Sequence, residues 1–114
     1  MGDPECQTIL PKLKTDLVEL LEACCNKKLA DINIKWTNKK SLCVVLCSKG
    51  YPDSYQKNII INNLENFSLK ENNFIFHAGT KKKNEKIYAT GGRVLNFTSL
   101  SDDFLQARDE VHKC

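Results

Sequence analysis

The stretch between Phe74 and Ser99 constrains the fold more than any other part of this chain of 114 residues. It reads FIFHAGTKKKNEKIYATGGRVLNFTS, with three short apolar runs at residues 74–78, 87–89 and 93–97. The first run alternates between two faces, as a β-strand does. A charged loop, residues 81–85, separates the first two runs, and Gly91-Gly92 separates the last two. A glycine pair inside a strand pattern marks a bulge or a close approach of backbone or ligand. The stretch therefore predicts an antiparallel hairpin followed by a tight return.

Helical spacing dominates the first part of the chain and its last residues. Apolar side chains recur at helical intervals from Gln7 to Cys25, with a break near Lys14 that divides them into two helices. Ser101 is placed to cap a last helix that runs to His112. Further strands are expected at Ile32–Trp36, Leu42–Cys47 and Ile59–Ile61, and polar loops between Asn62 and Asn73. We therefore predict an α+β fold in which helices flank an antiparallel, barrel-like sheet from Ile32 to Thr98.

Charge and hydropathy exclude two classes of partner. The net charge of +3 is too small to indicate binding to nucleic acid. No apolar run approaches the roughly 20 residues that a membrane helix needs, and the N-terminus lacks the pattern of a signal peptide. We therefore expect a cytoplasmic protein that binds neither nucleic acid nor a membrane.

The spacing of the six cysteines argues against a disulfide framework or a metal site. Cys43 and Cys47 fall in one predicted strand, where their Cα atoms would be about 13 Å apart, too far for a bridge. Cys24 and Cys25 are neighbours, no C-x-x-C pair occurs, and the two histidines sit at no zinc-ligand spacing. We expect free thiols in a reducing compartment and no metal ligands in this chain.

Four short strings give the chain a specific resemblance. They are Gly2-Asp3-Pro4-Glu5 with Gln7; Lys49-Gly50-Tyr51-Pro52 with Tyr55 and Lys57; Phe76-His77-Ala78-Gly79-Thr80; and Gly91-Gly92-Arg93-Val94-Leu95-Asn96. In this order, and across the whole chain, they resemble the C-terminal part of the phosphoribosylamine–glycine ligase (glycinamide ribonucleotide synthetase) family of the ATP-grasp superfamily.

The resemblance implies a fold and an activity. Residues 1–30 would be the C-terminal end of an ATP-grasp domain, and residues 31–114 a small, slightly truncated β-rich domain with a terminal helix. The family joins glycine to 5-phosphoribosylamine through a glycyl phosphate, with ATP and magnesium or manganese, in purine biosynthesis. Its nucleotide-binding lysines and metal ligands lie upstream of the Gly2–Glu5 string. The chain alone is therefore expected to be inactive and to need the missing N-terminal part of the ligase as a partner.

The resemblance also implies the site residues. Asp3 and Glu5 would line the catalytic cleft. The substrate-binding set would be Gln7, Gly91, Gly92 and Arg93. An arginine suits bidentate phosphate binding, so Arg93 would face the phosphoribosyl substrate. A β-bulge beside a surface arginine explains the same residues equally well, and both interpretations stay open.

Two further features have plainer explanations. His77 lies on a predicted strand, where a structural hydrogen bond is favoured over catalysis. Lys81–Lys83 could present positive charge to an acidic partner if the chain were a free-standing β-sandwich binding module, but a solvated hairpin tip is favoured. The exposed apolar face of the predicted helices favours the ligase, since a complete module should cover its own apolar surface.

Overall fold

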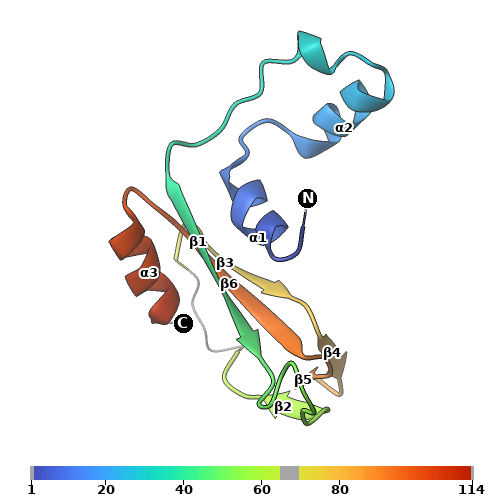
Figure 1. Ribbon diagram of the computed structural model, residues 1–114, viewed down its shortest axis with the longest axis vertical. Helices are drawn as coiled ribbons and strands as arrows, with labels where there is room; N and C mark the ends of the chain where they lie inside the picture. Colours follow the sequence, from blue (N-terminus) through green and yellow to red (C-terminus); the bar gives the residue numbers. More distant parts are fainter. Residues whose placement is uncertain (1, 65–69, 114) are drawn as a thin grey trace.

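The computed structural model describes residues 2–64 and 70–113. Figure 1 shows two helical segments at the N-terminal end, two small sheets, and a final helix. The helical part consists of α1 (Glu5–Ile9), η1 (Leu10–Lys12), α2 (Leu17–Cys25) and η2 (Leu29–Asp31). No helix among residues 2–64 and 70–113 is long and apolar enough to cross a membrane. The polar loops predicted between Asn62 and Asn73 fall partly outside the described residues.

The predicted break between the first two helices is confirmed. The backbone N–H groups of Lys14 and Thr15 donate to the carbonyl of Lys35, at 2.9 and 3.3 Å, instead of continuing the helix. The next helix, α2, begins after Asp16, whose Oδ1 accepts from the N–H groups of Val18 and Glu19. This cap satisfies donors that have no partner within the helix.

The prediction of a strand at Ile32–Trp36 is wrong. This segment forms only an isolated antiparallel bridge, between Leu13 and Trp36. The Thr37 N–H donates to the carbonyl of Lys12 at 2.8 Å, so the segment pairs with the connection between the helices. Alternation correctly indicated an extended backbone, but pairing within a sheet needs a neighbouring strand that the local sequence does not specify.

The strands form two antiparallel sheets of three strands each. This arrangement confirms the predicted α+β class, but the prediction of a single sheet is wrong. The first sheet has the order β1 (Lys40–Cys47), β6 (Arg93–Ser101), β3 (Asn73–His77). The second has the order β2 (Ile59–Ile61), β5 (Lys86–Ala89), β4 (Thr80–Lys83). The central strand of the first sheet, β6, is almost entirely buried.

The lysine run lies in a strand, so the prediction of a loop over residues 81–85 is wrong for its first three residues. Lys81, Lys82 and Lys83 belong to the edge strand β4, where exposed charged side chains are well tolerated. The turn to β5 is made by Asn84 and Glu85 alone, with φ of 48° and 59°. Positive φ at both central residues suits a two-residue hairpin turn.

Helix α3 (Phe104–His112) covers one face of the first sheet, and α1 lies on the other (Figure 1). Phe97 of β6 stands in register with Val44 and Ile75 and clusters with Val111 of α3. The N-cap of α3 is Asp103, whose Oδ1 accepts from the Gln106 N–H at 2.8 Å. The predicted cap, Ser101, is instead the last residue of β6, because the strand continues further than its apolar pattern indicated.

Candidate active-site corner

The third and fourth sequence strings meet at a glycine corner, which we define as Gly79, Gly91 and Gly92. The Gly91 N–H donates to the Gly79 carbonyl at 3.1 Å, and the Gly79 N–H donates to the Arg93 carbonyl at 2.9 Å. A Cβ built on Gly79 would lie 2.6 Å from the Gly91 Cα, closer than real Cβ atoms come to backbone. Two main chains cross here at a distance that only glycine allows.

The second string packs against the same corner. The Ser48 N–H donates to the Gly92 carbonyl at 2.7 Å, and the Ser48 hydroxyl donates to the Gly91 carbonyl at 2.8 Å. The ring of Tyr51 fills the space that a side chain on Gly92 would need. The glycine pair is therefore a tight packing point, held by hydrogen bonds from the loop after β1.

The first string joins the corner through an ion pair. The Nη2 of Arg93 lies 2.9 Å from the Oδ2 of Asp3, and its Nη1 donates to the Asp3 carbonyl at 3.2 Å. The Nε2 of Gln7 donates to the Oδ1 of Asp3 at 3.2 Å. The Thr98 hydroxyl, on β6, donates to the Gln7 carbonyl at 3.0 Å. Asp3, Gln7 and Arg93 thus form one connected group with the neighbouring corner, which contains Gly91 and Gly92, and the Asp3 side chain in it remains 60% exposed.

Glu5 takes a different position from its predicted partner Asp3. It is the first residue of α1 and is exposed. Its carboxylate lies beside Gly2, so a Cβ added there would collide with it. Within the described part of the chain, no hydrogen bond or ion pair joins Glu5 to Asp3 or Arg93.

His77 has the structural role that the sequence favours. It is exposed at the end of β3, and its Nδ1 lies 2.9 Å from the Oγ1 of Thr80. The two side chains bridge the turn between β3 and β4, which confirms the predicted hydrogen bond.

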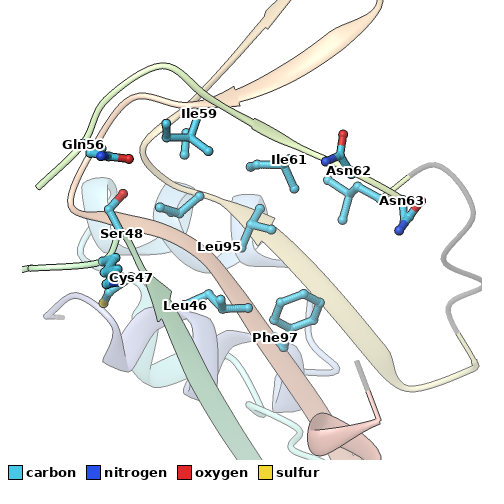
Figure 2. A pocket seen from close by; sticks show the side chains of 14 residues that line it. Leu46, Cys47, Ser48, Gln56, Ile59, Ile61, Asn62, Asn63, Leu95 and Phe97 are labelled. Carbon is cyan, nitrogen blue, oxygen red and sulfur yellow. The ribbon is translucent and has the colours of Figure 1, made fainter.

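An apolar cavity of about 570 Å³ lies beside the corner, between the two sheets (Figure 2). Ile59 and Ile61 face Leu95 and Phe97 across it. Ser48, which binds the glycine corner, also lines this cavity. Neither charged residue of the Asp3–Arg93 pair is in its wall, so the cavity and the charged site are separate features.

The sequence pointed to Asp3, Gln7 and the glycines as candidates, but it did not indicate the hydrogen bonds that join them to their neighbours. Ser48 and Thr98, which hold the corner and the Gln7 backbone, were missed. Their small hydroxyl side chains give no local signal, since their roles depend on register between distant segments. In residues 2–64 and 70–113, no group of three histidine, cysteine or acidic side chains could hold a metal ion.

The comparisons with known proteins agree with this geometry. Residues 41–114 match the family described as phosphoribosylglycinamide synthetase, C domain. The chain is 45% identical to a phosphoribosylamine–glycine ligase of Fusobacterium nucleatum, over 99% of this chain and 27% of that protein. It is 40% identical to a chloroplastic phosphoribosylamine–glycine ligase of Arabidopsis thaliana, over 97% of this chain and 21% of that protein.

A solved structure also matches the chain over nearly its whole length. The crystal structure of a phosphoribosylamine–glycine ligase from Thermotoga maritima matches with a TM-score of 0.66 at 26% identity, over 99% of this chain and 27% of that one. The chain thus spans about a quarter of the length of the relatives it matches. Together with the family match over residues 41–114, these alignments confirm the resemblance: the chain belongs to the phosphoribosylglycinamide synthetase C-domain family.

Proposed function

We propose that this chain is the C-terminal part of a ligase that joins glycine to 5-phosphoribosylamine, with ATP as the energy source. The observation that supports this most is the convergence of all four sequence strings. Asp3 of the first string binds Arg93 of the fourth, Tyr51 of the second packs on Gly92, and Gly79 of the third crosses Gly91. The four strings that carry the family resemblance therefore lie together in space, with the exposed Asp3–Arg93 pair at their edge.

Each group has a proposed role in that reaction. Asp3 and Glu5 face the catalytic cleft, where their carboxylates accept hydrogen bonds from the amine substrates. Gln7 and the glycine corner border the phosphoribosyl group, and the close packing of the corner fixes the backbone from which Arg93 extends. Among residues 2–64 and 70–113, no group of three histidine, cysteine or acidic side chains could hold a metal ion. As the family resemblance implies, we assign ATP and magnesium or manganese to the N-terminal part of the ligase.

The partner that completes the enzyme would dock on α2. On α2, Leu17, Val18 and Leu21 are 39%, 62% and 56% exposed. Trp36, in the segment that follows the helices, is 47% exposed. A contiguous apolar helix face of this kind indicates an interface. The remaining three-quarters of the ligase, which relatives have on one polypeptide, is the occupant that we propose.

Reconstitution tests the proposal. The chain would be co-expressed with the N-terminal three-quarters of the Fusobacterium nucleatum relative, and ADP release would be measured with glycine and phosphoribosylamine. We expect turnover by the complex and none by the isolated chain. Glu5→Ala should lower turnover by at least about tenfold, whereas Lys82→Ala, on the exposed edge strand, should change it by less than about twofold. ADP release by the isolated chain, or equal losses from the two substitutions, would contradict the proposal.

The interface has its own matched control. Leu21→Lys should abolish co-purification of the two parts, while Glu22→Lys on the neighbouring exposed surface of α2 should preserve it. Equal retention of the partner by both variants would show that α2 is not the interface.

Two further proposals concern the setting of the chain. We place the domain boundary near residue 30, since helices precede it and the strands begin at Lys40.

We also place the protein in the cytoplasm. The free thiols of Cys6, Cys24, Cys25, Cys43 and Cys47 support this, because thiols persist in reducing compartments. The free-standing binding module is not favoured, since Lys82 already pairs with Glu85 at 2.8 Å and all relatives named above are ligases.

A further inference from the structure

We propose that Arg93 is a positioning residue, whose guanidinium fixes the carboxylate and the backbone of Asp3 and so sets the loop that presents Asp3 to the substrates. This inference rests on the proposed ligase function but differs from the sequence expectation that Arg93 binds the phosphoribosyl group. It starts from one geometric fact. The two Nη atoms of Arg93 contact two different oxygens of Asp3, the side-chain Oδ2 at 2.9 Å and the main-chain carbonyl at 3.2 Å.

Arg93 is the better anchored of the two partners. Its backbone begins β6 in register with Cys47, and its carbonyl accepts from the Gly79 N–H. Asp3 lies in the turn before α1, a helix of five residues, and its side chain is 60% exposed. We therefore take the strand as the fixed side of the contact and Asp3 as the side that it positions.

The contact leaves acceptor sites free on Asp3 and directs both Nη groups of Arg93 at that one residue. A carboxylate offers about four acceptor sites. Arg93 takes one on Oδ2 and Gln7 takes one on Oδ1, so both oxygens retain acceptor capacity on an exposed side chain. Both Nη atoms of Arg93 lie against Asp3 oxygens, so a phosphate that bound across the two Nη atoms would have to displace this contact, while the Nε–H and the outer N–H groups are not taken by it.

Stability does not explain the contact. The side chains of Arg93 and Asp3 are 39% and 60% exposed, and ion pairs at such sites stabilise folded proteins little. What the fork of a guanidinium supplies is orientation, because two N–H groups hold two oxygens in one plane. Lysine has the same charge but cannot reproduce this geometry.

Kinetics of the reconstituted complex test the role. We expect Arg93→Lys to lower kcat by at least about tenfold while KM for phosphoribosylamine changes by less than about twofold. The double variant Asp3→Asn with Arg93→Lys should be no slower than Asp3→Asn alone, because Arg93 acts through Asp3. A rise in KM for phosphoribosylamine with kcat unchanged, and multiplicative losses in the double variant, would overturn the proposal and make Arg93 a substrate ligand.

A second measurement needs no ligase activity. In NMR spectra of the 114-residue chain, Arg93→Lys should shift the backbone amides of residues 2–7, and Asp3→Asn should shift the Arg93 Nε–H signal. Arg108→Lys is the matched control, since Arg108 pairs with its neighbour Asp109. Millimolar inorganic phosphate should leave the Arg93 signal unchanged.

The two measurements separate the two proposals. Unmoved amides in Arg93→Lys, or a phosphate-dependent shift of the Arg93 signal, would overturn the positioning role whether or not the complex is active. The expected NMR shifts together with an inactive complex would instead count against the ligase function and leave the Arg93–Asp3 contact established.

Discussion

Gly79 and Gly91 approach each other so closely that neither has room for a side chain. A Cβ on Gly79 would lie 2.6 Å from the Cα of Gly91, and a Cβ on Gly91 would lie 2.9 Å from the Cα of Gly79. Each glycine lies beside a strand of the hairpin region, and the bond from the Gly91 N–H to the Gly79 carbonyl joins them. The two sheets are linked at this crossing.

Gly79→Ala should lower the free energy of unfolding by about 1–3 kcal/mol, because the new methyl group meets backbone that cannot move aside. Urea denaturation of the chain would measure this. Gly2→Ala is the matched control: its methyl group meets only the end of the Glu5 side chain, which can rotate away. A loss as large for Gly2→Ala would show that the crossing is not the cause.

Gly92→Ala should destabilise the chain through Tyr51, whose ring occupies the position of the added methyl group. We expect a loss of about 1–3 kcal/mol, and a smaller loss from the same change made in a Tyr51→Ala background. A double-mutant cycle in urea would give the coupling directly. Additive losses would mean that Tyr51 does not fill this space in solution.

Glu85→Gly should stabilise the hairpin of β4 and β5. Glu85 has φ of 59°, a conformation that costs a residue with a Cβ about 1 kcal/mol or more, and that glycine adopts freely. Part of the gain is offset by the lost Lys82 ion pair and by a more flexible unfolded chain, so we expect a net gain of about 0.5 kcal/mol. Lys86→Gly, inside β5, should destabilise instead, and thermal unfolding of both variants would test the contrast.

Glu110 should make stability depend on pH. Hydrogen bonds from Lys70 and then Lys113 hold the pKa of this carboxyl below its ordinary value of about 4.5. A carboxyl with a lowered pKa stabilises the fold above its unfolded pKa, and the effect disappears as pH falls through the folded pKa. Glu110→Gln should therefore lower Tm at pH 7, with a difference from the unaltered chain that vanishes toward acid pH.

Periodicity in the sequence predicted the elements better than their partners. The break near Lys14 and the strand Ile59–Ile61 were found because each depends on its own residues. The pairing of β6 with both β1 and β3 depends on segments about 20 to 60 residues away, and local alternation carries no information about them. The same limit explains the error at Ile32–Trp36, whose extended backbone found its partner in a connection between helices.

The arrangement of the candidate site could not be predicted from the sequence. The resemblance named Asp3 and Arg93 separately, one as catalytic and one as substrate-binding. Asp3 contacts Arg93, and Glu5 does not, because the turn before α1 lies against the first residue of β6. No sequence pattern indicates how far Asp3 lies from Arg93.

The burial of β6 limits where the length of this chain can vary. Phe97 lies in the apolar cluster, whereas Thr98, on the opposite face of the strand, binds the Gln7 backbone. Deleting one residue before Phe97 would exchange these two faces or draw Arg93 away from Asp3. Insertions and deletions among natural relatives should therefore collect in exposed turns such as Asn84–Glu85, while the span from Arg93 to Ser101 stays constant in length.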